Sequence, residues 1–109
     1  MDLANRAARL VEQLDAQFPP LHISAVKASD TEFHVLGDKL LIQILPDNTV
    51  ANWNYALLQK LCNSVNEIGE SLELMCAPLS LNYISIYDVA GAEAEFGELC
   101  SYLNDGGQP

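Results

Sequence analysis

Positive charge is scarce in this sequence. Its 109 residues include five Lys and Arg against fifteen Asp and Glu, which gives a formal net charge of −10. Proteins that bind nucleic acid draw much of their affinity from Lys and Arg that displace counterions from phosphates. Anionic membrane surfaces attract basic segments by the same electrostatics. The composition therefore argues against both kinds of partner.

Cysteine and glycine motifs are also missing. The three cysteines, Cys62, Cys76 and Cys100, contain no C-x-x-C pair, so the sequence indicates neither a zinc knuckle nor a disulfide framework. The six glycines form no G-x-G-x-x-G and no phosphate loop, and neither H-E-x-x-H nor G-x-S-x-G occurs. We therefore expect no cofactor and no bound metal. These absences also favour a binding module over an enzyme.

Long apolar runs are the third absence. No run approaches the ~20 residues that span a bilayer. Residues 1–20 contain five charged side chains, where a signal peptide would have a continuous apolar stretch. Because unpaired cysteines suit a reducing compartment, we expect a cytoplasmic protein.

Half of the residues are hydrophobic and only 18% are charged, which suffices for one folded domain of ordinary size. The pattern of apolar residues predicts the order helix, three strands, helix, two strands, helix. We therefore predict a single α+β domain over residues 1–104, with a mainly antiparallel sheet of four or five strands and three helices. Residues 105–109 are expected to form a flexible tail.

The helices are predicted from apolar residues spaced by three and four positions. The first begins with Asp2 as its N-cap and ends before Pro19. The second follows capping residues at 47–49, and Gly69 is the expected residue just beyond its end. The third covers residues 92–103, with an inward stripe of Phe96, Leu99, Cys100 and Leu103.

Two-residue alternation predicts strands at residues 21–28, 32–36 and 81–87, and an apolar run predicts another at 39–45. Turn-forming residues at 29–31 indicate that the first two strands form a hairpin. Residues 39–45 are almost continuously apolar, which is typical of a strand buried on both faces. Residues 70–77 fit either a helix or a strand, and we interpret them as a strand.

A strand over 32–36 would give one candidate for chemistry. Its two-residue period would place Asp30, Glu32 and His34 in a row on one face. Two carboxylates and an imidazole could bind a metal or exchange protons. The alternative is a solvated strand face with Phe33 and Val35 packed beneath it, and we favour that alternative.

Aromatic residues offer candidates for binding. Tyr83, Ser85 and Tyr87 share one face of the strand 81–87, and tyrosines are enriched where proteins meet. Half-buried tyrosines under a helix are the competing interpretation. Tyr55 lies off the apolar stripe of its helix, so we expect it to be exposed. The cysteines at 62 and 100 fall on apolar helix faces, which indicates core packing.

Negative charge is concentrated in the second half of the chain. Residues 61–109 carry −8 and contain no Lys or Arg, whereas the first sixty residues carry −2. The third predicted helix turns Glu93, Glu95 and Glu98 outward. This surplus either improves solubility or attracts a basic protein partner, and the sequence leaves both interpretations open.

The predicted order of elements in a small acidic chain resembles that of the effector chaperones of type III secretion systems. The resemblance covers the whole chain and carries no shared motif. It implies a non-enzymatic α+β homodimer that holds a segment of a secretion substrate in a non-globular state. Toxin-neutralising immunity proteins and phage-encoded inhibitors have a similar composition.

The leading hypothesis is a small acidic protein-binding module, such as a chaperone, inhibitor or immunity-type adaptor. The alternative is a small-molecule-binding protein or small enzyme that uses a concave sheet face lined by the tyrosines. A homodimer is also expected, because Leu40, Leu41 and Ile42 are apolar on both strand faces and one face needs a cover. Because two subunits of charge −10 repel each other, we expect that interface in the less charged first sixty residues.

Overall fold

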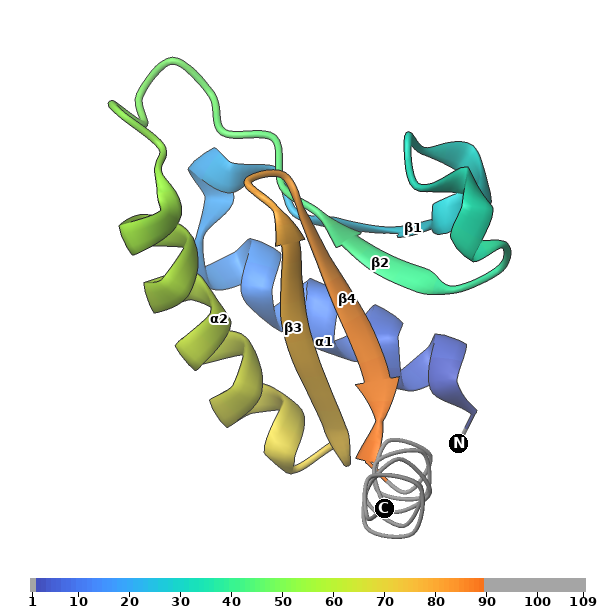
Figure 1. The fold of residues 1–109 in the computed structure, drawn as a ribbon. Helices are drawn as coiled ribbons and strands as arrows, with labels where there is room; N and C mark the ends of the chain where they lie inside the picture. Colours follow the sequence, from blue (N-terminus) through green and yellow to red (C-terminus); the bar gives the residue numbers. More distant parts are fainter. Residues whose placement is uncertain (1, 90–109) are drawn as a thin grey trace, which may run out of the picture.

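A computed structural model describes residues 2–89 of the chain, and they form a four-stranded antiparallel sheet with two α-helices on one of its faces (Figure 1). The strands lie in the spatial order β1-β2-β4-β3. This confirms the predicted α+β class. The elements in chain order are α1 (Leu3–Gln17), β1 (Ser24–Lys27), β2 (Leu40–Gln43), α2 (Tyr55–Glu70), β3 (Leu74–Ser80) and β4 (Tyr83–Asp88).

Helix α1 forms as its sequence predicts. Asp2 caps it, and its carboxylate accepts a hydrogen bond of 2.8 Å from the backbone N–H of Asn5. Leu10 and Leu14 are buried on its apolar face. The helix ends at Gln17, just before the two prolines at 19 and 20.

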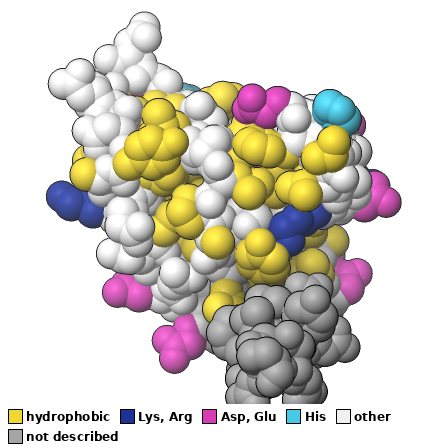
Figure 2. Space-filling view, viewed as in Figure 1, with side chains coloured by type: hydrophobic (Ala, Val, Ile, Leu, Met, Phe, Trp, Pro, Cys, Tyr) yellow, Lys and Arg dark blue, Asp and Glu magenta, His cyan; other side chains and the backbone are white. Residues whose placement is uncertain are grey.

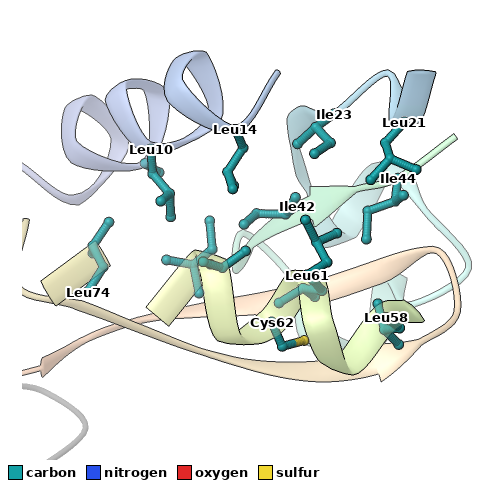
Figure 3. Close-up of a cluster of buried hydrophobic side chains, with 14 residues drawn as sticks. Leu10, Leu14, Leu21, Ile23, Ile42, Ile44, Leu58, Leu61, Cys62 and Leu74 are labelled. Carbon is teal, nitrogen blue, oxygen red and sulfur yellow. The ribbon is translucent and has the colours of Figure 1, made fainter. Parts of the chain in front are cut away.

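The core lies between the two helices, α1 and α2, and alternate residues of the central strands β2 and β4. Ile42 and Ile44 from the β2 segment and Ile84 and Ile86 from β4 are fully buried or nearly so, and they pack with residues from both helices (Figure 3). Leu41, on the opposite side of β2, is also 0% exposed. Burial on both faces is therefore confirmed at Leu41 and Ile42, whereas Leu45 is 51% exposed. Leu41 needs no second copy to cover it.

The predicted strand at 32–36 is wrong, and so is its hairpin with residues 21–28. β1 pairs instead with β2, and the residues between them form two short 3-10 turns, at Ala28–Asp30 and His34–Leu36. The Thr31 hydroxyl donates to the Ala28 carbonyl and accepts from the backbone N–H of Phe33. Such local side-chain bonds compete with a strand ladder, which is why alternation alone misled here.

The second helix starts later than predicted. Asn54 is its N-cap and accepts from the backbone N–H of Leu57. The Asp47 carboxylate instead accepts from the backbone N–H of Thr49 in a local turn. The loop that precedes α2 is tied to the sheet by the Trp53 indole, which donates to the Leu81 carbonyl at 2.7 Å.

Gly69 was expected just beyond α2, and it lies inside the helix and is buried. A Cβ atom at this position would meet the backbone oxygen of Leu74 at 2.9 Å. Glycine therefore serves here for the close approach of α2 to the start of β3. It does not end the helix.

Residues 74–80 form β3, so the strand interpretation of 70–77 is confirmed from Leu74 onward, while residues up to Glu70 belong to α2. The predicted helix at 92–103 and the tail at 105–109 lie outside the described residues. Within residues 2–89 the chain thus has one strand fewer than the order that resembles the effector chaperones. None of the helices in this part of the chain is long and apolar enough to cross a membrane.

Arg6 links α1 to strands β3 and β4, on the side of the sheet away from β1. Its guanidinium donates to the carbonyl oxygens of Leu72 and Glu73, at 3.2 and 3.4 Å, and forms an ion pair with the Asp88 carboxylate. The Arg6 side chain is only 15% exposed. One side chain therefore holds the start of β3, the end of β4 and α1 together.

We predict that Gly69→Ala destabilises the protein by about 1–2 kcal/mol, because the clash with the Leu74 carbonyl outweighs the better helix propensity of alanine. Urea unfolding followed by circular dichroism measures the free energy of unfolding. Glu67→Ala, at an exposed position of the same helix, is the control and should change it by less than about 0.5 kcal/mol. An equally small effect of Gly69→Ala would contradict the close approach.

We predict that Arg6→Met lowers the free energy of unfolding by about 2–3 kcal/mol, because two carbonyls and a carboxylate lose a charged donor. Arg9→Met, which removes an exposed charge from the same helix, should have little effect. Thermal unfolding of the two variants makes the comparison. Equal losses would mean that helix charge, and not the three contacts of Arg6, is responsible.

Candidate protein-binding surface

Among residues 2–89, both α-helices lie on one face of the sheet, and the other face carries none. Because Ile84 and Ile86 point into the core, Tyr83, Ser85 and Tyr87 point the other way along β4, on one shared face, as the sequence predicts. Figure 2 views the molecule from this side and shows hydrophobic side chains gathered over the strands. We call this surface the open sheet face, and its residues are Val26, Lys39, Leu41, Gln43, Met75, Ala77, Tyr83, Ser85 and Tyr87.

Tyr83 is engaged in contacts within the chain. Ser24, Gln43 and Tyr83 lie directly opposite one another across β1, β2 and β4. The Gln43 amide donates to the Tyr83 hydroxyl at 3.1 Å, and the Ser24 hydroxyl donates to the Gln43 amide oxygen at 3.5 Å. The Phe33 ring meets the Tyr83 ring edge to face, with centroids 5.5 Å apart. Tyr83 thus holds the turns at residues 28–36 against the sheet.

Ser85 and Tyr87 are also held by neighbours. Ser85 is 0% exposed, and its hydroxyl donates to the Ala77 carbonyl at 3.0 Å. The Lys39 ammonium lies 3.7 Å from the centre of the Tyr87 ring, a cation–π contact. Of the three predicted binding residues on β4, Tyr87 is therefore the one in contact with a charged group, while Ser85 is packed away from solvent.

The row of Asp30, Glu32 and His34 does not form, because Asp30 and His34 lie in 3-10 turns and Glu32 lies in the turn between them, not on a strand. All three are exposed. The remaining histidine, His22, lies 3.2 Å from the Asp47 carboxylate at the opposite end of β1, also in solvent. Among residues 2–89 there is no group of three His, Cys, Asp or Glu side chains that could hold a metal ion.

The two described cysteines are packed in the fold. Cys62 is 2% exposed in the core, as predicted. The Cys76 thiol lies 3.4 Å from the Asn66 amide oxygen and 3.9 Å from the Cys62 carbonyl. Burial raises the pKa of the Cys62 thiol, and burial with the nearby Cys62 raises the pKa of Cys76 to about 12. Neither is suited to act as a nucleophile at neutral pH. Cys100 lies outside the described residues.

Several large apolar side chains remain exposed that the alternation of the sequence did not identify. Val35 was expected beneath a strand and is 83% exposed in the second 3-10 turn. Tyr55, at the first position of α2, is 66% exposed, in line with its predicted exposure. The others are Leu36, Leu45, Met75 and Leu79. Leu36 lies in the second 3-10 turn, Leu45 follows β2, and Leu79 lies at the register shift of β3, so strand alternation gave no signal for these three. Met75 lies in regular register on the edge strand β3.

The helix side offers one shallow apolar groove of about 230 Å³. It lies between the end of α1 and the first turns of α2 and is lined by Phe18, Leu21, Trp53, Leu57, Lys60, Leu61 and Ser64. Small-molecule sites usually enclose ~300–1,000 Å³ and contain convergent polar groups. This groove is smaller, and Lys60 is its single charged group.

The predicted binding residues Glu93, Glu95 and Glu98 lie outside the described part of the chain. No protein-family model, no curated protein and no solved structure matches this chain. Function must therefore be argued from the surface chemistry alone.

We predict that iodoacetamide at about pH 8 leaves Cys62 and Cys76 unmodified in the folded protein, because their thiolate fractions are very small and Cys62 is inaccessible. Peptide mass spectrometry after a timed reaction measures the modification of each cysteine. In concentrated urea both should react at the rate of a free thiol. Rapid modification of Cys76 in the native protein would contradict its burial against Asn66.

Proposed function

We propose that this chain is a small acidic protein-binding module, of the chaperone, inhibitor or immunity-adaptor type. The observation that carries the proposal is the combination of a −10 charge with large apolar side chains left in solvent, Val35 and Tyr55 above all. Exposed apolar side chains close to charge are typical of surfaces that bind other proteins.

The negative charge of this chain favours a partner of particular chemistry. An acidic surface speeds association with a basic partner and repels acidic ones, while apolar contacts supply the affinity. We infer that the partner presents a basic segment with apolar residues. Cytoplasmic residence is part of the proposal, since the free thiols of Cys62 and Cys76 suit a reducing compartment.

The small-molecule alternative has less support. Its proposed lining used Tyr83, Ser85 and Tyr87 with Glu32 and His34. Ser85 is buried, and the Tyr83 hydroxyl is hydrogen-bonded to Gln43. Glu32 and His34 are exposed in turns and do not lie on a strand. The binding module therefore remains the better account of this surface.

We also propose that the protein forms a homodimer through its first sixty residues. The support is the position of four exposed apolar side chains, Val35, Leu36, Leu45 and Tyr55, in the half of the sequence that carries only −2. Light scattering coupled to size-exclusion chromatography should give about twice the 11.9 kDa chain mass. Val35→Asp and Tyr55→Asp would locate the interface, and a monomer at high micromolar concentration would refute it.

We predict that a photo-crosslinking amino acid at position 55 or 35 captures a specific protein in cells, whereas the same group at the exposed polar position Gln13 does not. Mass spectrometry separates a heterologous partner from a second copy of this chain. The captured protein is then purified and titrated. Equal yields at all three positions, or no product at 35 and 55, would contradict a binding module that uses its exposed apolar residues.

We predict that the affinity for this purified partner falls by about tenfold or more between ~50 and ~500 mM salt, because the Debye length shortens severalfold over that range. Isothermal calorimetry or fluorescence anisotropy measures the dissociation constant. An affinity that does not change with salt would remove the electrostatic part of the proposal.

A further inference from the structure

The open sheet face is least covered where the described chain ends. Met75 lies opposite Tyr87 on neighbouring strands and is 45% exposed. The last described residue, Val89, donates its backbone N–H to the Glu73 carbonyl, so the chain leaves the sheet beside this pair. The turns at 28–36 contact the sheet through Phe33 at Tyr83, toward the other end of β4. Residues 2–89 therefore leave an apolar strip over Met75 and Tyr87 without a cover.

Twenty residues of this chain, 90–109, follow directly from that point and lie outside the described structure. Their sequence predicts an amphipathic helix over 92–103, with Phe96, Leu99, Cys100 and Leu103 on one narrow stripe. Twelve helical residues span ~18 Å, and the six residues of β4 span ~20 Å. A helix that turned back after Val89 would thus be long enough to cover the strip over Met75 and Tyr87.

The distribution of charged residues also suits a helix placed on the open sheet face. Lys39 lies over the Tyr87 ring at 3.7 Å and is the cation of the open sheet face. Residues 90–109 contain four acids and no Lys or Arg. At 100° per residue, Glu93 and Glu95 flank the two edges of the apolar stripe of the predicted helix, whereas Glu98 lies on its opposite side. In this arrangement Glu93 would lie beside Lys39 and Glu98 would face solvent.

We propose that residues 92–103 of this same chain pack on the open sheet face, with their apolar stripe over Met75 and Tyr87 and Glu93 beside Lys39. The sheet would then have helices on both faces. This proposal does not depend on the binding function. It does imply that the open sheet face is an internal surface, and that the acidic outer side of the segment is the surface presented to partners.

The native Cys100 provides the test, because it lies on the predicted stripe while Cys62 and Cys76 are packed in the fold. In the full-length protein, we expect iodoacetamide to modify Cys100 about tenfold or more slowly than it modifies a cysteine at position 101 in the double variant Cys100→Ser, Ser101→Cys. Position 101 lies off the stripe. Equal rates for the two positions would overturn the proposal.

A substitution in the sheet identifies the docking surface. Met75→Glu should raise the modification rate of Cys100 about tenfold, whereas Ala56→Glu, at an exposed apolar position on α2, should leave it unchanged. Continued protection of Cys62 shows that each variant is folded. Protection of Cys100 that survives Met75→Glu would place the segment elsewhere and overturn the proposal. Protection that disappears on dilution would assign the cover to a second copy, which also overturns it.

Discussion

The antiparallel pairing of β2 with β4 joins parts of the chain that lie far apart in sequence, and both faces of the sheet depend on it. Gln43 lies opposite Tyr83 and Ile42 opposite Ile84. On one face the isoleucines complete a core with both helices. On the other face the same pairing places a glutamine amide against a tyrosine hydroxyl. β1 and β3 then add to the two outer sides of this central pair.

Each end of the sheet is secured by a different kind of interaction. Near the start of β4, the Phe33 and Tyr83 rings and the Trp53 indole attach two loops to the sheet. At the end of β4, the guanidinium of Arg6 bonds to carbonyls and to Asp88. The Tyr83 ring, the Trp53 indole N–H and the Arg6 guanidinium thus take part in contacts that hold two loops and α1 to the sheet.

The same features bear on the proposed binding role. The serine of the open face is buried and bonded to a backbone carbonyl, and burial holds the Cys76 thiol protonated. The histidines lie apart, one beside Asp47 and one in a turn. By contrast, exposed apolar residues such as Val35 and Tyr55 need no activated group to contribute to binding.

The sequence by itself determined the α+β class, α1 with its Asp2 cap, and the shared face of Tyr83 and Tyr87, because these depend on local periodicity and capping. Only the tertiary structure decided the partner of β1, since the bonds of Thr31 within its own turn outweigh the alternation of residues 32–36. The close approach of α2 to β3 at Gly69 and the contacts of Arg6 with Leu72, Glu73 and Asp88 could not be predicted from the sequence either. They join residues distant in sequence, and neither leaves a local pattern from which it could be predicted.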